Sequence, residues 1–281
     1  HRNTETPKHR NTETPKHRVM ARPIITLTTD FGASSPYSGA VRGVILSING
    51  DARLIDITHA IPAQNVRHGA IVLAQVTPLF PAGTIHLAVV DPGVGSDRPI
   101  VCAEIGGQTY VAPDNGLLSR LAAVRRPSKI ITVSRSEFWR DQVSPTFHGR
   151  DIMAPVAARL SLGLAPDALG PRQEGFLEFA WPETRIVDNR IEGEVVSVDS
   201  FGNLITNISA EMLRPVPTDS SLIIRCDEHE TVGLFTSYAE QPEMTFVALI
   251  GSSGYLELAI VNESAATMLS LGEGAPVTLI W

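Results

Sequence analysis

The stretch VVDPGVGSDR, from Val89 to Arg98, places an aspartate and an arginine on either side of a turn-forming segment. Asp91 follows the apolar run TIHLAVV, and the proline and two glycines after it end the strand and turn the chain back. The pattern predicts a strand that carries a carboxylate to its C-terminal end and a loop that returns Arg98 to that carboxylate.

His148 lies in SPTFHGRD, where a loop meets the start of a predicted helix, with Arg150 and Asp151 beside it. The first turn of a helix exposes backbone N–H groups and the positive end of the helix dipole, which favours an anion or a water. Asp91, Arg98 and His148 could together hold a water molecule. The carboxylate would accept one of its protons, the arginine would fix the carboxylate's charge, and the histidine would orient the water or relay a proton.

Two further acids end apolar runs in the same way. Asp30 closes ITLTTDFG and Asp199 closes GEVVSVDSFGN, each with a glycine within three residues, as at Asp91. Each acid alone could cap a turn or a helix. The repeated pattern favours a set of site residues drawn from separate strands.

A metal site built from Asp30, Asp91, His148 and Asp151 is a competing interpretation. The chain has no His-x-x-x-His or Glu-x-x-His spacing, and Arg98 would be an unfavourable neighbour for a cation. We therefore predict no bound metal and no cofactor.

Other sequence signatures are absent. The segment GVGSDR does not open a helix after the first strand, and neither a Walker A sequence nor a G-x-S-x-G elbow occurs. In IGSSGYLE, Ser252 and Ser253 could offer hydroxyl and backbone N–H groups to a carboxylate, and a plain β-turn explains them equally well.

The composition limits the possible partners and location. HRNTETPK occurs twice at the start of the 281-residue chain, so we interpret residues 1–19 as a tag or disordered leader and Met20 as the native start. The net charge of −7 disfavours nucleic acid, and no apolar run is long enough to span a membrane. No signal peptide follows Met20, and Cys102 and Cys226 are expected to be buried free thiols. These features favour a cytoplasmic protein.

The order of strand-like and helix-like segments predicts two domains. Between about residues 23 and 163 the segments alternate, which indicates an N-terminal α/β domain (20–183) with a mainly parallel central sheet. A Pro- and Gly-rich linker follows Pro166, and the remaining segments are short β-rich runs separated by turns. We expect an all-β, barrel-like domain at 184–281.

Seven motifs in order, from about Ile24 to the C-terminus, resemble the S-adenosylmethionine (SAM) hydroxide adenosyltransferases, or SAM hydrolases, which are relatives of the fluorinases and chlorinases. The motifs are TTDFG…SPYSGAVRGVIL, DITHAIPAQNVRHGA, VVDPGVGSDR, APDNGLL, FHGRD, DSFGNLITNI and GSSGYLELA. The resemblance implies an α/β domain, a β-barrel domain and a homotrimer with active sites between the N-domain of one subunit and the C-domain of its neighbour. It also implies that water or hydroxide attacks C5′ of SAM, releasing adenosine and methionine.

The resemblance also implies roles for individual residues. The family's Asp-Arg-His triad matches Asp91, Arg98 and His148. The substrate-binding positions are matched by residues of both domains: Asp30 for the ribose hydroxyls, Asp199 for the methionine ammonium group, Phe201 and Asn203 for adenine, and Ser252 for the methionine carboxylate, with Tyr255 and Glu257 nearby.

Two other hypotheses remain beside a SAM hydrolase. One is a metal-dependent hydrolase, and the other is a non-enzymatic module that binds adenosine or SAM. Halogenation is disfavoured, because the halogenases of this family lack the DPGVG…R segment and because a carboxylate aimed at the nucleophile repels a halide.

Overall fold

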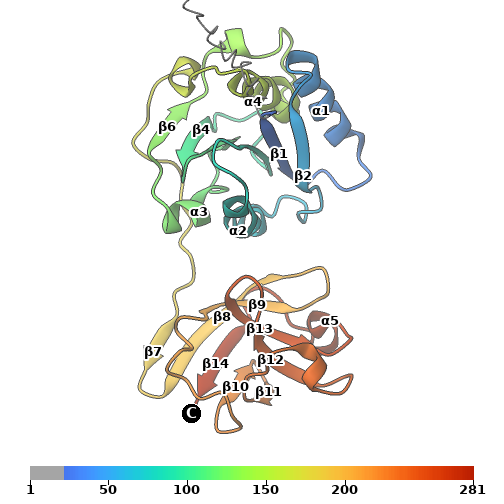
Figure 1. Ribbon diagram of the computed structural model, residues 1–281, viewed down its shortest axis with the longest axis vertical. Coiled ribbons are helices and arrows are strands. Elements are labelled where there is room, and N and C mark those ends of the chain that lie inside the picture. Colours follow the sequence, from blue (N-terminus) through green and yellow to red (C-terminus); the bar gives the residue numbers. More distant parts are fainter. Residues whose placement is uncertain (1–21) are drawn as a thin grey trace, which may run out of the picture.

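The computed structural model describes residues 22–281, and the leader predicted at 1–19 lies outside them. Two layered parts follow one another along the chain, joined by an extended segment (Figure 1). The segment between Gln173 and Thr184 contains no helix or strand. The division that we predicted between residues 183 and 184 stays a proposal.

The N-terminal part is built on a six-stranded mixed sheet in the order β2-β1-β3-β5-β4-β6. Three neighbouring pairs, β1–β2, β1–β3 and β3–β5, are parallel, whereas β4 is antiparallel to both β5 and β6. The strands are β1 (Ile24–Thr29), β2 (Arg53–Thr58), β3 (Ile85–Val89), β4 (Ile100–Ile105), β5 (Gln108–Pro113) and β6 (Lys129–Thr132). Gly106 and Gly107 join β4 to β5 with φ of 61° and 80°, the geometry of a tight two-residue hairpin, so this pair is antiparallel.

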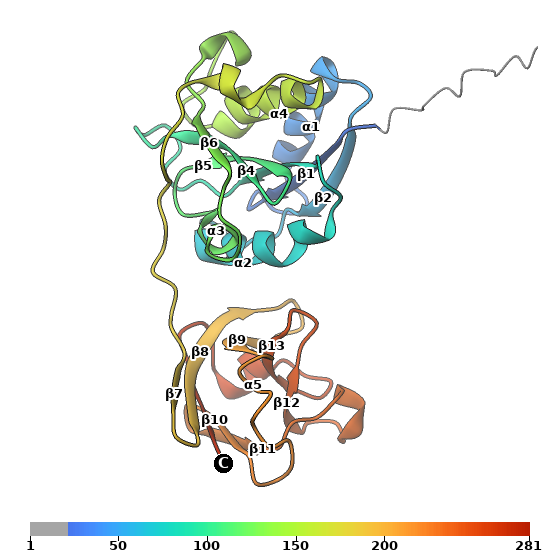
Figure 2. The same cartoon turned by 60° about the vertical axis from the view of Figure 1, so that its left-hand side comes forward.

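Helices cover both faces of this sheet, as the α/β prediction requires (Figures 1 and 2). Helices α1 and α4 pack on one face, and α2 and α3 pack on the other. Their bounds are α1 (Pro36–Ile48), α2 (Val66–Val76), α3 (Ser119–Val124) and α4 (Ala154–Ser161). The Ser35 side chain caps α1 and the Asn65 side chain caps α2, each accepting a hydrogen bond from a backbone N–H. Because both faces are covered, a ligand can reach this sheet only at its edges and strand ends.

The C-terminal part is an eight-stranded antiparallel sheet that is nearly closed into a barrel, which confirms the barrel-like fold. The two ends of the sheet, β11 and β12, approach each other, and the Thr231 hydroxyl donates to the Phe246 carbonyl at 2.7 Å. The elements are β7 (Arg185–Val187), β8 (Arg190–Val198), β9 (Leu204–Ser209), β10 (Ile223–Cys226), β11 (His229–Val232), β12 (Phe246–Ile250), β13 (Tyr255–Ile260), α5 (Ala265–Leu269) and β14 (Pro276–Ile280).

Cys102 and Cys226 are both buried and free, as expected. Between residues 22 and 281, no helix has the length and apolar character needed to cross a bilayer.

His86 on β3 is fully buried in the N-terminal sheet. Its Nδ1 lies 2.7 Å from the Thr26 hydroxyl on the neighbouring strand, and its ring stacks on Tyr110 with 4.7 Å between the centroids. Burial lowers the pKa of His86 to about 4, because an imidazolium loses its hydration in the core. His86 is therefore a neutral, structural histidine at pH 7.

This burial predicts a loss of stability in mild acid. The unfolded chain binds a proton at His86 near pH 6.5 and the folded chain only near pH 4, so stability falls as the pH drops through this window, by about 3 kcal/mol in total. We expect His86→Gln to flatten the dependence of the free energy of unfolding on pH between 6.5 and 4 in urea titrations. If the pH dependence of the free energy of unfolding is the same in this variant, groups other than His86 cause it.

Candidate active site

Asp91 and Arg98 form a bidentate ion pair at the C-terminal end of β3. Arg98 Nε donates to Asp91 Oδ1 at 2.8 Å, and Arg98 Nη2 donates to Asp91 Oδ2. Both side chains are nearly buried, with exposed fractions of 5% for Asp91 and 10% for Arg98. The turn between them is closed by the Val94 N–H, which donates to the Asp91 carbonyl at 3.2 Å. The predicted return of the arginine to the carboxylate is therefore present.

His148 contacts the arginine of this ion pair. Its Nδ1 lies 3.2 Å from Arg98 Nη2. A guanidinium can only donate, so Nδ1 must be the unprotonated, accepting nitrogen, and the proton of the neutral ring sits on Nε2. Nε2 has no hydrogen-bond partner within residues 22–281, and His148 lines a cavity together with Asp91. His148 thus presents an N–H donor beside an acceptor carboxylate.

The charge state of His148 follows from its surroundings. Partial burial and the Arg98 guanidinium lower the pKa of His148 below 6.5, and the carboxylates of Asp91 and Asp151 oppose this only in part. The ring is therefore neutral at pH 7. Protonation would place a second cation against Arg98 and break the hydrogen bond at Nδ1.

Asp30, at the end of β1, lines the same cavity as Asp91 and His148. Its Oδ2 accepts a hydrogen bond from the Gln64 N–H at 2.8 Å. Gln64 has a φ of 64°, a left-handed conformation that is unfavourable for a residue with a side chain. This strained backbone conformation directs the N–H of Gln64 at the carboxylate and fixes its orientation.

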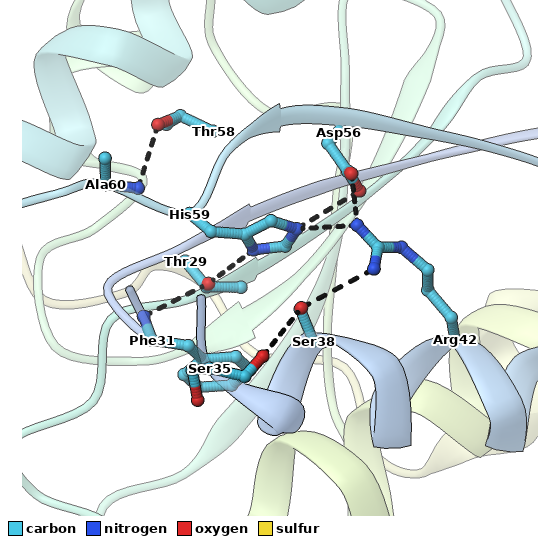
Figure 3. Close-up of polar contacts among 9 residues, drawn as sticks. All are labelled: Thr29, Phe31, Ser35, Ser38, Arg42, Asp56, Thr58, His59 and Ala60. Carbon is cyan, nitrogen blue, oxygen red and sulfur yellow. Dashed lines mark hydrogen bonds and ion pairs between the residues drawn. The ribbon is translucent and has the colours of Figure 1, made fainter. Parts of the chain in front are cut away.

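A polar cluster around His59 fixes the end of β1, next to Asp30 in the sequence (Figure 3). His59 Nδ1 lies 2.8 Å from the Thr29 hydroxyl, and the His59 carbonyl accepts from the Gly32 N–H at 2.8 Å. His59 Nε2 lies 3.1 Å from both Arg42 of α1 and Asp56 of β2, which are ion-paired to each other. The segment around Asp30 is therefore held by groups from three elements.

The N-terminal cavity has a volume of about 430 Å³. Three aromatic rings, Phe31, Tyr37 and Phe147, line it and contact one another edge to face, with centroids 5.2 to 6.0 Å apart. Our sequence analysis did not single out these rings or Gln64, although all four lie within or beside the motifs quoted above. The cavity combines an apolar wall with the polar groups of Asp30, Asp91 and His148.

A second cavity, of about 820 Å³, lies in the C-terminal part, and Asp199, Phe201 and Asn203 line it. Asp199 accepts hydrogen bonds from the backbone N–H groups of Phe201 and Asn203, at 2.9 and 2.8 Å, and from the Asn203 side chain at 3.0 Å. Phe201 is 77% exposed. An acid fixed by its own loop thus lines the same cavity as a largely exposed aromatic residue.

Ser252 and Glu257 line the same C-terminal cavity. Glu257 is buried and accepts a hydrogen bond from the Tyr238 hydroxyl. Burial raises the pKa of Glu257, and the nearby Asp199 carboxylate adds to this rise. Glu257 is not the solvent-facing residue that its place in a strand could have suggested.

Tyr255 has a different environment. Its hydroxyl accepts a hydrogen bond from Arg120 of α3 at 2.9 Å, and the Arg120 guanidinium also stacks over the Trp181 ring at 5.3 Å. Tyr255 lines a separate space between the two parts of the chain, not the cavity of Asp199. In this conformation it joins the two domains.

Apart from Tyr255, the predicted site residues that line a cavity therefore form two groups in different parts of the chain. The cavity that contains Asp91 shares no residue with the cavity that contains Asp199. Within residues 22–281 no group of three or more His, Cys, Asp or Glu side chains is arranged to hold a metal ion, and Asp151 is bonded to two arginines. The first group can place a water between a donor and an acceptor, and the second can bind a cationic or aromatic ligand.

Comparison with known proteins identifies the family of this chain. Residues 25–170 match the SAM hydroxide adenosyltransferase N-terminal domain, and residues 193–278 match the corresponding C-terminal domain. A protein named (R)-S-adenosyl-L-methionine hydrolase from Thermus thermophilus is 38% identical, and the match covers 92% of this chain and 100% of the relative. A protein of the same name from Salinispora tropica is 36% identical, and the match covers 90% of this chain and 95% of the relative. A fluorinase from Nocardia brasiliensis is 27% identical, covering 91% of this chain and 96% of the fluorinase.

A solved structure shows the same fold. An uncharacterised conserved protein from Thermotoga maritima superposes with a TM-score of 0.86 at 33% identity, covering 92% of this chain and 100% of that protein. Matches of this extent in both domains show the family. This chain belongs to the SAM hydroxide adenosyltransferase family.

Proposed function

We propose that this protein is a SAM hydrolase that converts SAM and water to adenosine and L-methionine. The observation that carries the proposal is the cavity that Asp30, Asp91 and His148 line together, with Arg98 hydrogen-bonded to both Asp91 and His148. The name of these relatives specifies the (R) epimer of SAM at sulfur, and we propose the same substrate epimer for the present chain.

The water would be held at two points. His148 Nε2–H donates to the water oxygen, and Asp91 accepts one of the water's protons, which leaves a lone pair free to attack C5′. The C5′–O bond forms as the C5′–S bond breaks, and the sulfur keeps the electron pair as a neutral thioether. The proton passes to Asp91 and then to solvent. A sulfonium leaves without protonation, so positioning the water supplies most of the catalysis.

The substrate contacts that we propose follow the family roles. Asp30 would accept hydrogen bonds from the ribose hydroxyls. The C-terminal cavity would bind the remaining groups: Asp199 the methionine ammonium group, Phe201 and Asn203 adenine, and Ser252 the methionine carboxylate, with Glu257 and Tyr255 nearby. For Tyr255 this role would require it to leave Arg120.

The two separate cavities support a shared site. Each holds part of the proposed contacts, and the exposed Phe201 ring lies in the half that would be completed by another subunit. We propose a homotrimer in which the N-domain of one subunit meets the C-domain of its neighbour at each active site. A cytoplasmic location and the lack of a cofactor remain predictions.

The first prediction concerns Asp91. Asp91→Asn should lower kcat/KM for adenosine formation by about 100-fold or more, because the water loses its proton acceptor. The measurement is chromatography of nucleosides after incubation with each SAM epimer, in EDTA and without chloride. Asp97→Asn changes an exposed acid of the same loop and should keep full activity.

Each alternative predicts a different result in this assay. Loss of wild-type activity in EDTA would indicate a metal-dependent hydrolase. SAM bound tightly by the wild type with no adenosine released would indicate a binding module.

The second prediction concerns pH. Because the pKa of His148 is lowered, the acid limb of kcat/KM should have its midpoint below pH 6.5, as protonation at Nδ1 opposes Arg98. His148→Gln should be slower and should lose this acid limb. A limb at the same pH in His148→Gln would assign it to another group.

The third prediction concerns the shared site. Asp91→Asn and Asp199→Asn subunits, each inactive alone, should recover activity when they are co-expressed with two tags and purified as mixed oligomers. With random mixing, about a quarter of the active sites combine an intact Asp91 from one subunit with an intact Asp199 from its neighbour. Absence of any recovery in verified mixed oligomers would place the whole site within one chain.

A further inference from the structure

Asp151 is the most deeply buried carboxylate beside the proposed site. Its side chain is 0% exposed, yet it carries a charge. Burial by itself would raise the pKa of Asp151, but hydrogen bonds from Arg150, from the Ser144 N–H and from Arg140 overcome this and lower it to about 2. These partners together keep the carboxylate charged, because an unpaired buried carboxylate is strongly unfavourable.

The partners of Asp151 come from both ends of the loop that carries His148. Arg140 Nη1 donates to Oδ1 at 2.8 Å and the Ser144 N–H donates to Oδ2 at 2.9 Å, both from the start of the loop. Arg150 donates from Nε and Nη2 at 2.7 and 2.8 Å. The Arg140 N–H also donates to the Asp151 carbonyl at 2.9 Å. One carboxylate thus closes the loop on itself.

The residues between the two ends of this loop connect Asp151 to the cavity. The Arg150 guanidinium lies over the Phe147 ring, 4.8 Å from its centroid, and Phe147 lines the cavity beside His148. Residues Gly149–Met153 form a π-helical turn directly after His148. Such turns are rare and often accompany functional sites.

The closed loop is also packed against the Asp91 loop and β3. A Cβ atom on Gly95 would lie 2.4 Å from the Pro145 carbonyl, and one on Gly149 would lie 3.0 Å from a Val89 methyl group. The position of the loop therefore determines how far His148 stands from Arg98. A small shift would break the 3.2 Å contact at Nδ1.

From this geometry we infer that Asp151 is a positioning residue for hydrolysis, which holds the loop 140–149 so that His148 accepts from Arg98 and aims Nε2–H into the cavity. The inference rests on the proposed function for its kinetic consequence. The position of His148 can be measured without any turnover.

The test compares Asp151→Asn with Asp167→Asn. Asp167 is an exposed acid of the same domain that pairs with Lys129, so its loss should change neither kcat nor the His148 signals. Asp151→Asn should lower kcat by about 10-fold or more with less than a threefold change in KM, since substrate binding rests on other residues. The acid limb in the pH profile of this variant's activity should move up toward pH 6.5, because a displaced His148 no longer contacts Arg98 and is more hydrated.

Nitrogen-15 NMR of the histidine rings gives the readout that is independent of activity. In the wild type, His148 should show an unprotonated Nδ1 and a protonated Nε2, and in Asp151→Asn the two tautomers should average. Asp151→Glu should restore part of the wild-type spectrum and of kcat. If Asp151→Asn does not fold, Arg140→Gln, which removes one partner at a half-exposed position, should give the same changes to a smaller extent.

Unchanged His148 signals in folded Asp151→Asn would overturn the inference, whatever the activity. An acid limb that moves down instead of up would also overturn it, because it would show that Asp151 acts on His148 only through its charge. A wild-type protein without SAM hydrolase activity would refute the proposed function but leave the NMR test in force.

Discussion

The nearly buried ion pair between Asp91 and Arg98 is the interaction on which the rest of the proposed site depends. Taking both charges out of water is unfavourable, and the Coulomb attraction of the pair with the two hydrogen bonds of its bidentate geometry offsets that loss. The pair has consequences beyond its own stability. Because Arg98 also donates to His148, it determines which nitrogen of the imidazole carries a proton and therefore what His148 offers to the cavity.

This constraint explains why so much of the surrounding structure serves to hold loops. The Gly95 backbone lies against Pro145, Gln64 adopts a left-handed conformation to bind Asp30, and Asp151 closes the loop that ends at His148. Reactions that depend on placing a water behind a carbon atom are sensitive to small displacements. The C-terminal barrel supplies different groups, an acid and an exposed ring, and these lie in their own cavity. The homotrimer that we propose would bring these two sets of groups together at each active site.

Much of the N-terminal site could be predicted from the sequence. Asp30 and Asp91 follow neighbouring parallel strands, whose carboxyl ends share an edge of the sheet, so their meeting follows from the α/β pattern. The mainly parallel sheet was predicted from the alternation of segments, but the antiparallel placement of β4 was not, although Gly106 and Gly107 are a typical hairpin signal. The φ of Gln64 could not be predicted, since nothing in its residue type requires it.

Tyr255 shows a second limit of prediction from sequence. Residues two apart in a regular strand share a face, so Tyr255 and Glu257 would both be expected in one cavity. The pairing of β13 with β9 shifts register between these two residues, and an irregularity of this kind can redirect a side chain. Tyr255 instead bonds to Arg120 of the other domain. Such a shift depends on the partner strand and cannot be read from the motif GSSGYLELA alone.

The central claim is that a water held by Asp91 and His148 attacks C5′ directly. The most direct test is a single turnover with enzyme in excess over SAM in water enriched in oxygen-18, followed by mass spectrometry of the adenosine. Direct attack predicts that the adenosine of this first turnover carries oxygen-18 at its 5′ position. Unlabelled adenosine would contradict the account, because it would show that a carboxylate oxygen of the protein attacks C5′ and that water acts only later.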